Sequence, residues 1–536
     1  MAPIEYVLIY PLFGIVALAV VVLINDYRLW QRMPPGPRPL PFIGNQHQLP
    51  KSKPWIQFEE WSQRFGPIFT IWIGRRPTIV LSDPIIAQEL MEKRSAKYSS
   101  RPRMIAMGEL LWKGGSILVQ PYGKEWSIRR KLLHQALMPR ALQEYLPIQE
   151  AEATRLCAQL FEKPEKWEAL FERFTSSIVF SIAYGHRIDS MGSSVIKQRF
   201  EFMQYSASLN VPGKYMVESI PALKHVPNFL APWKADIERH GKKEADANMA
   251  LVDVVRSDIA KARSSGAMDT LPKSLCRLLL EIREREAGEI PLSDRDFSFI
   301  PASLFGAGSD TTASTMCSAI LAFVTHPDTA RCAQLELDHV VGSDRSPTFA
   351  DAPKLPYLTA LVKEILRWRP VAVLGGTPHA STMDDHYNGF FIPKGTTVLG
   401  NSWAINMNPE YYPRPHVFEP ERFIERGEKN ATEFRGQASH PSKSGHSSFG
   451  WGRRICPGAD LAYNSLFIAL AKLLWTFDFS AIPGVRYDIF DYTDGFNIRP
   501  RSFQCKIQVR DEHRAHVIGK ETQDAERFLD NFSPFD

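Results

Sequence analysis

The sequence predicts a mainly α-helical domain with small β-sheets, preceded by one N-terminal transmembrane helix. Residues 6–25 are apolar and uncharged, and a helix needs about 20 such residues to cross a bilayer core. From residue 85 to about residue 339, amphipathic periodicity, capping residues and scattered prolines indicate successive helices. Short β-rich runs flank this helical region, within residues 69–81 and 371–398.

The composition is that of a globular protein with a large core. Of 536 residues, 44% are hydrophobic and 23% are charged. A net charge of +5 is too small to indicate nucleic-acid binding, and no basic stripe alternates with aromatic residues. The mild positive excess can still favour an acidic protein partner locally. The six cysteines lie far apart without zinc-ligand spacing, which indicates reduced thiols: Cys157, Cys276, Cys317, Cys332, Cys456 and Cys505.

The N-terminal segment, residues 1–33, is predicted to be a membrane anchor. Glu5 precedes the apolar run, and Arg28 and Arg32 follow it. The positive-inside rule therefore places the N-terminus outside the cytosol and the rest of the chain within it. A cleaved signal peptide is the alternative, but such peptides have a shorter apolar stretch behind a basic start.

The remainder of the chain divides into three parts. Residues 34–45 contain so many prolines that they form a stiff, extended hinge. Residues 46–510 show no second linker, internal repeat or low-complexity block, so one domain is predicted there. Residues 511–536 form a charged tail that is expected to be loosely ordered. In a cytosolic domain, the sequons at Asn430 and Asn531 stay unglycosylated.

The predicted strands follow from local composition. Residues 69–73 and 78–81 are β-rich and are separated by Gly74 and a turn at 75–77, which predicts a hairpin. Residues 371–398 consist of short strand-like runs interrupted by glycine and proline, and residues 504–509 are a last strand-like run.

The most informative motif surrounds Cys456. Pro457 cannot donate a backbone hydrogen bond and has φ fixed near a helical value, so a helix is predicted to begin there and to continue through Leu474. Cys456 then lies at a helix N-terminus, where the dipole favours a thiolate. A thiolate is a suitable axial ligand for haem iron. For an isolated cysteine, a buried structural role would be the better interpretation.

Five positions of this loop match the pattern Phe-x-x-Gly-x-Arg-x-Cys-x-Gly: Phe449, Gly452, Arg454, Cys456 and Gly458. The pattern resembles the haem-binding loop of cytochrome P450 monooxygenases. The resemblance implies that Cys456 ligates the iron of haem b and that Phe449, Arg454 and Gly458 contact the cofactor. Glycines here allow tight turns and a close approach to a flat group, and Arg454 can pair with a haem propionate.

A second motif lies within the apolar segment 297–324. Asp310 and Thr311 would cost desolvation free energy in the middle of such a helix unless they serve a function. Gly306 and Gly308 weaken the helix locally, and a Thr hydroxyl can loosen its backbone ladder, so water could enter and carry protons. A packing face of small residues with one satisfied Asp is the alternative. The segment resembles the oxygen-activation motif of P450 enzymes, which assigns catalysis to Asp310 and Thr311.

Two further sets are weak individually. Glu364 and Arg367 would normally form a surface pair, but with Arg422 they resemble the buried structural triad of P450 enzymes. Trp126 and Arg130 share one helix face, and with His379 they resemble the residues that bind the haem propionates. Taken alone, Trp126 would be a core residue and His379 a solvated loop histidine.

All these motifs occur in the family's order between Pro34 and about Val509. The chain is therefore identified as a member of the cytochrome P450 family, of the membrane-anchored microsomal type, most similar to filamentous-fungal P450s of secondary metabolism. The resemblance implies a haem-thiolate monooxygenase of the endoplasmic reticulum membrane that faces the cytosol and oxidises a hydrophobic small molecule with O₂. No fused flavin domain or dinucleotide motif is present, so NADPH electrons must come through NADPH–cytochrome P450 reductase, with cytochrome b5 as a further candidate donor.

Two other functions stay open at this stage. One is a P450-fold isomerase, dehydratase or peroxide-using enzyme that needs no reductase, and the other is a non-catalytic haem-binding protein. The Asp310–Thr311 pair argues against both. The expected substrate is apolar, in the manner of an aromatic polyketide, because the segments expected to line the pocket are mainly apolar: residues 104–111, 209–216, 301–304, 371–376 and Phe496.

Overall fold

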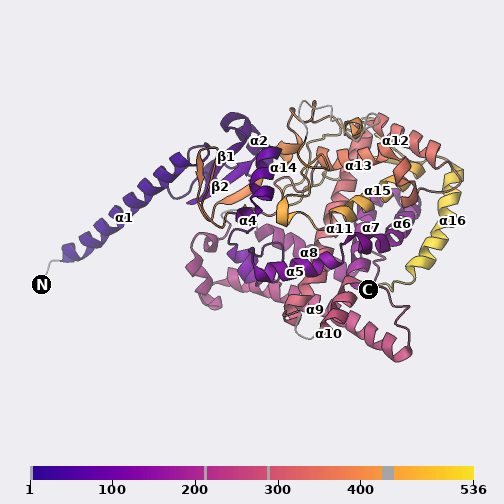
Figure 1. Ribbon diagram of the computed structural model, residues 1–536, viewed down its shortest axis with the longest axis horizontal. Helices are drawn as coiled ribbons and strands as arrows, with labels where there is room; N and C mark the ends of the chain where they lie inside the picture. The colour runs from indigo at the N-terminus through magenta and orange to yellow at the C-terminus, as the bar shows by residue number, and fades with distance from the viewer. Residues whose placement is uncertain (1–3, 210–213, 286–289, 425–439, 536) are drawn as a thin grey trace.

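The computed structural model describes residues 4–209, 214–285, 290–424 and 440–535, and only the backbone of residues 4–12 and 15. Figure 1 shows a broad helical body from which α1 (Ile4–Arg32) projects as a single long helix. The C-terminal end of α1 contacts the body. Asp26 forms an ion pair of 2.7 Å with Arg75, and the Arg32 guanidinium lies 4.4 Å from the centre of the Phe391 ring.

Helices make up most of the body, as the sequence predicts. The α-helices after α1 are α2 (Pro54–Phe65), α3 (Pro84–Ala87), α4 (Ser95–Tyr98), α5 (Lys124–Gln135), α6 (Pro139–Glu162), α7 (Trp167–Tyr184), α8 (Ser194–Leu209), α9 (Pro232–Ser265), α10 (Leu275–Arg285), α11 (Asp294–Thr325), α12 (Pro327–Val340), α13 (Pro356–Trp368), α14 (Ser402–Asn406), α15 (Ala459–Thr476) and α16 (Glu512–Leu529). Short 3-10 and π segments connect several of them.

The main sheet has the strand order β1-β2-β6-β3. The predicted hairpin is confirmed: β1 (Ile68–Ile73) pairs antiparallel with β2 (Arg76–Leu81), so the turn is tighter than expected. β6 (Thr397–Gly400) runs parallel to β2 and antiparallel to β3 (His379–Ala380). The two-stranded sheets are β4 (Asp385–Tyr387) with β5 (Phe390–Ile392), and β7 (Phe477–Ser480) with β8 (Lys506–Val509).

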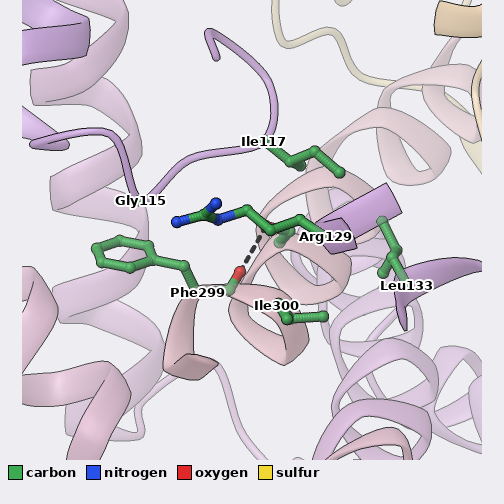
Figure 2. Close-up of a pocket in the computed structure, with 7 residues that line it drawn as sticks. Gly115, Ile117, Arg129, Leu133, Phe299 and Ile300 are labelled. Carbon is green, nitrogen blue, oxygen red and sulfur yellow. Dashed lines mark hydrogen bonds between the residues drawn. The ribbon is translucent and has the colours of Figure 1, made fainter. Parts of the chain in front are cut away.

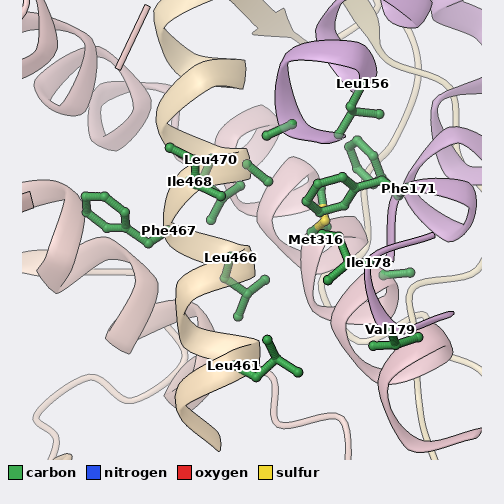
Figure 3. Close-up of a cluster of buried hydrophobic side chains, with 14 of the residues drawn as sticks. Leu156, Phe171, Ile178, Val179, Met316, Leu461, Leu466, Phe467, Ile468 and Leu470 are labelled. Carbon is green, nitrogen blue, oxygen red and sulfur yellow. The ribbon is translucent and has the colours of Figure 1, made fainter. Parts of the chain in front are cut away.

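The core surrounds α11, which packs against α7, α9, α12 and α15. Its start is well specified, because the Ser293 side chain accepts a hydrogen bond from the backbone N–H of Asp296 and two aspartates occupy the first turn. Figure 3 shows how α6, α7, α11 and α15 contribute to one apolar cluster, with Leu156, Phe171, Met316 and Leu466 among its members. This packing fixes the two helices, α11 and α15, between which the site is expected.

The C-terminal segment is ordered, so the expectation of a loose tail is wrong. α16 packs along α6, and Val517, Ile518 and Leu529 are buried on one face. Charged residues on the other faces form specific contacts: Arg514 pairs with Asp338 at 2.6 Å, and Glu521 lies 3.8 Å from the buried ammonium group of Lys472. The high charge reflects an amphipathic helix rather than disorder.

The predicted anchor, residues 1–33, lies partly outside the described part of the chain, which lacks residues 1–3 and the side chains of 4–12 and 15. Within the described part, no helix combines the length and the apolar character that a membrane crossing requires.

Candidate active site

Cys456 lies in the loop between a 3-10 turn (Gly452–Arg454) and α15. The helix expected from Pro457 begins two residues later, at Ala459, with Gly458 as its N-cap. The loop is held at both sides of the cysteine. The Cys456 N–H donates to the Phe449 carbonyl at 2.9 Å, and Arg130 of α5 donates to the Ile455 carbonyl at 2.7 Å.

The Cys456 side chain is accessible although protein surrounds it. Burial raises the pKa of its thiol, while the Gly458 N–H and the Arg130 charge act in the opposite direction. A thiol in this setting loses its proton readily only when a cation binds the sulfur. A side chain that is accessible to solvent but surrounded by protein is typical of a residue that lines an internal cavity.

The two glycines beside Cys456 have different roles. Gly452 has φ +56°, and a Cβ there would lie 2.2 Å from the Met91 carbonyl oxygen, so only glycine fits. Gly458 has an ordinary φ of −95°, which corrects the expectation that it makes a tight turn. No atom lies within 4 Å of a Cβ built on Gly458. The open side of Gly458 leaves room for a flat group next to the thiol.

Arg454 is fixed by the backbone around it. Its guanidinium donates to the carbonyls of Ser99 and Gln120, both at 2.7 Å, and lies 4.3 Å above the Trp126 ring. Burial, together with the nearby charge of Arg130, lowers the pKa of Arg454 to about 9. These hydrogen bonds leave N–H groups of Arg454 free to bind an anion.

Arg101 belongs to the same cluster, and the sequence analysis missed it. It donates to the carbonyls of Thr377 at 2.6 Å and Leu118 at 3.2 Å, and only 9% of it is exposed. Burial and the neighbouring Arg454 lower its pKa strongly. In the sequence it is one of 64 basic residues, and only its folded position distinguishes it.

His379 of β3 is buried, which is the opposite of the solvated loop histidine considered as its alternative. Its Nδ1 lies 2.8 Å from the Tyr98 carbonyl oxygen. A carbonyl only accepts, so we assign the proton to Nδ1. Burial, and next the charge of Arg101, lower the pKa of His379 to about 3. Because Nδ1 holds the one proton of the neutral ring, Nε2 can donate to a carboxylate only after the ring takes up a second proton. The carboxylate itself must then stabilise the positive charge of the ring.

Arg101, Arg130 and Arg454 thus form a cluster of positive charge in which Arg101 is buried and the other two are half-buried. Among the residues that the structure describes, none of the three has a carboxylate partner. Charges removed from water are costly when they are unpaired, so the cluster favours an anionic ligand. Within the same ranges, no group of three His, Cys, Asp or Glu side chains could hold a metal ion. The residues therefore fit a metal that is already held within a larger cofactor, one that also carries two carboxylates. Haem b is such a cofactor.

The middle of α11 presents an accessible stripe within an otherwise buried helix. Ser303, Ala307 and Thr311 recur at every fourth position and are partly or fully exposed, and Asp310 beside them is partly exposed. The Thr311 hydroxyl donates to the Ala307 carbonyl at 2.8 Å. The helix nevertheless continues unbroken from Asp294 to Thr325, so the expected loosening is not found. The Asp310 carboxylate accepts a hydrogen bond of 3.1 Å from Asn497.

A small hollow lies beside this stripe, between α5 and the first half of α11. Figure 2 shows the Arg129 side chain reaching toward Phe299, with Ile117 and Ile300 nearby. Arg129 is buried, and its guanidinium is 3.5 Å from the Asp296 carboxylate. Arg129 therefore joins α5 to α11, whereas the adjacent Arg130 reaches the Cys456 loop from the same helix.

The structure also brings Glu364, Arg367 and Arg422 together. Arg367 binds Glu364 through two hydrogen bonds of 2.6 Å, and neither side chain is exposed. The Arg422 Nε lies 3.5 Å from the same carboxylate. Arg367 also donates to the Asn406 carbonyl at 2.9 Å. The geometry is that of a closed network, and its structural role stays a prediction.

A helical body, a loop-borne cysteine and a partly buried arginine cluster fit a haem-thiolate protein. The family model for cytochrome P450 matches residues 34–507. The chain is 37% identical to cytochrome P450 monooxygenase 58 of Postia placenta, over 91% of this chain and 90% of the relative. It is 35% identical to a cytochrome P450 monooxygenase of Armillaria gallica (92% and 93% covered) and 34% identical to cytochrome P450 monooxygenase fogE of Aspergillus ruber (91% and 89% covered). The chain belongs to the cytochrome P450 monooxygenase family, whose members use haem b and receive NADPH-derived electrons through a reductase.

Proposed function

We propose that the protein oxidises a hydrophobic small molecule, an aromatic polyketide-like secondary metabolite, with NADPH–cytochrome P450 reductase as its electron donor. The observation that carries this proposal is the Asp310–Thr311 pair on the accessible stripe of α11. Haem b, held through Cys456 and the arginine cluster, would supply the O₂-activating chemistry, in which one oxygen atom enters the substrate and the other leaves as water.

The residues of α11 would manage the protons. The Thr311 Oγ1 donates to the Ala307 carbonyl and keeps its lone pairs free to accept from a water molecule. The Asp310 Oδ2 accepts a hydrogen bond from Asn497, and no described residue donates a hydrogen bond to its Oδ1. A water that binds Thr311 Oγ1 and Asp310 Oδ1 would be held ready to deliver a proton.

The pocket is proposed to accept an apolar ligand. Leu118 is 44% exposed although it lies beside the arginine cluster, and Leu374 and Phe496 are partly accessible. Accessible apolar side chains near a buried charged site are typical of a small-molecule pocket. Of the predicted lining segments, residues 210–213 lie outside the described residues.

Thr311→Ala is expected to keep haem and divert NADPH electrons to hydrogen peroxide. Without Oγ1 the proton-donating water is lost, and positioned proton donors contribute about 10²–10⁴-fold to such steps. The measurement is peroxide released per NADPH oxidised by the full-length haem protein with added reductase and naphthalene as an apolar probe.

The matched control is Thr315→Ala, which removes a similar bond, 3.0 Å to the Thr311 carbonyl, one turn along the same helix. That variant should behave as the wild type. If Thr311→Ala also leaves the peroxide share unchanged, Thr311 is a packing residue, and the reductase-independent isomerase, dehydratase or peroxide-using function becomes the better proposal.

We also propose attachment to the endoplasmic reticulum membrane through residues 1–33, with the domain facing the cytosol. The support is the uncharged run 6–25 followed by Arg28 and Arg32. Exposed basic residues near the Cys456 loop, including Lys124, Lys131 and Arg453, support docking of an acidic donor, the reductase or cytochrome b5.

Deletion of residues 1–33 is expected to leave haem binding intact and to release the domain from the membrane fraction after high-salt and carbonate washing. The body should survive because its own apolar cluster around β1 and β2 remains. The deletion removes the contacts of Asp26 and Arg32 and the packing of Leu29, Trp30 and the buried Met33 against that cluster, so a lower denaturant midpoint is expected. A truncated protein that stays in the washed membranes would place the attachment elsewhere in the chain.

A further inference from the structure

A closed loop near the C-terminus lies along α11. Residues 491–501 fold back on themselves: the Thr493 N–H donates to the Arg499 carbonyl at 2.8 Å, and the Arg501 N–H donates to the Asp491 carbonyl at 2.9 Å. The Arg499 N–H also donates to the Thr493 hydroxyl at 3.1 Å. At the tip, Gly495 has φ +135°, which favours glycine. The tip is therefore a defined structure rather than a free end.

The loop contacts α11 at two levels. Near its base, Tyr492 donates to the Ser318 hydroxyl at 3.0 Å, and Arg499 lies 3.9 Å from the Cys317 sulfur. At its tip, the Asn497 amide donates to the Asp310 Oδ2 at 3.1 Å. Cys317 is seven residues, about 10 Å of helix, from Asp310. The base thus holds the loop in place while the tip reaches the residue assigned to proton delivery.

Asn497 is the one side-chain hydrogen-bond partner that the described residues give Asp310. An amide nitrogen donates but does not release its proton at neutral pH, so Asn497 cannot pass protons on. Its hydrogen bond to a carboxylate is charge-assisted and therefore stronger than one between neutral groups. Because Oδ2 accepts this bond, Oδ1 is left without a side-chain donor among the described residues. Phe496, the adjacent residue, is partly accessible and belongs to the predicted pocket lining.

We propose that Asn497 is a positioning residue that orients the Asp310 carboxylate for proton delivery. This inference rests on the proposed role of Asp310 and goes beyond it, since it names the group that fixes the carboxylate. Because Phe496 precedes Asn497 at the loop tip, a ligand that moves this tip would also move the hydrogen bond to Asp310.

The test compares Asp310→Asn, Asn497→Leu and the double variant in the full-length haem protein. Leucine keeps the volume of Asn497 without the amide. With reductase, NADPH and naphthalene, we measure NADPH oxidised and hydrogen peroxide released. Two electrons and two protons convert O₂ into hydrogen peroxide. NADPH that is oxidised without an equal amount of peroxide has instead supported cleavage of the O–O bond, which needs further protons and gives water or oxidised product.

We expect Asn497→Leu to lower about tenfold the rate at which NADPH is oxidised without release of peroxide. The effect should be smaller than the full contribution of a positioned proton donor, because Asp310 itself remains. In the Asp310→Asn background, Asn497→Leu should add no further loss, because it acts through Asp310. The spectral dissociation constant for naphthalene should stay unchanged. Tyr492→Phe is the matched control, since it removes a loop–α11 hydrogen bond that does not reach Asp310.

The outcomes separate the two proposals. A wild-type rate in Asn497→Leu, or losses that add in the double variant, overturns the positioning role while leaving that of Asp310 intact. A wild-type rate in Asp310→Asn, or a wild-type enzyme that already releases all its electrons as peroxide, overturns the proposed function and the inference with it. If Asn497→Leu loses haem, Asn497→Ser takes its place, because it is smaller and polar and cannot span the 3.1 Å contact from the same backbone.

Discussion

Cys456→Ser is expected to abolish the thiolate signature in the absorbance of the reduced, CO-bound protein. A serine hydroxyl is neutral at neutral pH and is a poor iron ligand, whereas the cysteine thiolate donates electron density to the metal. The loop itself should persist, because the hydrogen bonds that shape it do not involve the Cys456 side chain: the Cys456 N–H donates to the Phe449 carbonyl, and the Arg130 guanidinium donates to the Ile455 carbonyl. Oxidation of any probe with NADPH and reductase should fall to background.

Two measurements accompany this prediction. The haem content, determined after extraction, distinguishes loss of the ligand from loss of the cofactor, since the cluster of Arg101, Arg130 and Arg454 remains in the variant. Cys332→Ser is the control, because Cys332 is exposed on α12. A normal thiolate spectrum in Cys456→Ser would show that another group ligates the iron.

The features that the sequence predicted well are those encoded by neighbouring residues. The turn at Gly452 is one such feature, because Gly452 and Cys456 must be close in sequence for the backbone to turn and expose the thiol, whereas the roles of the loop residues toward haem stay predictions. The β1–β2 hairpin is another, since its β-rich runs and turn residues are contiguous. The family, haem b and the mainly helical class followed from these local patterns.

The features that the sequence analysis missed depend on contacts between distant segments. Arg101 joins the site only because β3 and the segment after α4 meet, which places it beside the Thr377 carbonyl 276 positions away. Asn497 reaches Asp310 across 187 positions. Neither arginine nor asparagine is rare enough for its position to be noticed without the fold.

Two errors have a different physical origin. The charge of residues 511–536 suggested disorder, but the apolar positions Val517, Ile518 and Leu529 suffice to bury one face of α16. Gly306 and Gly308 suggested a loosened helix, yet α11 is held along its length by α7 and α15. Tertiary packing overrides a local propensity of about 1 kcal/mol per glycine.

The second large effect is expected from Arg367→Ala, which should prevent stable haem incorporation. The Glu364 carboxylate stays unexposed in this variant. Among the described residues it keeps two partners, the Arg422 Nε at 3.5 Å and the Glu419 N–H at 2.9 Å. Breaking a buried pair in this way lowers the free energy of unfolding by about 3–5 kcal/mol. The Asn406 carbonyl also loses its donor.

The denaturant midpoint of the haem absorbance and the yield of holoprotein should therefore fall together. Arg367→Lys should lie between the variant and the wild type, because an ammonium keeps the charge but cannot form the two parallel bonds of 2.6 Å. Arg414→Ala is the control: Arg414 pairs with Glu419 at 3.2 Å but is 69% exposed, and such surface pairs contribute about 0–1 kcal/mol. Equal midpoints for Arg367→Ala and Arg414→Ala would refute the structural role of the triad. A large loss confined to Arg367→Ala would mean that the network of Glu364, Arg367 and Arg422 is needed to hold the haem, although its side chains are too deeply buried to take part in the reaction.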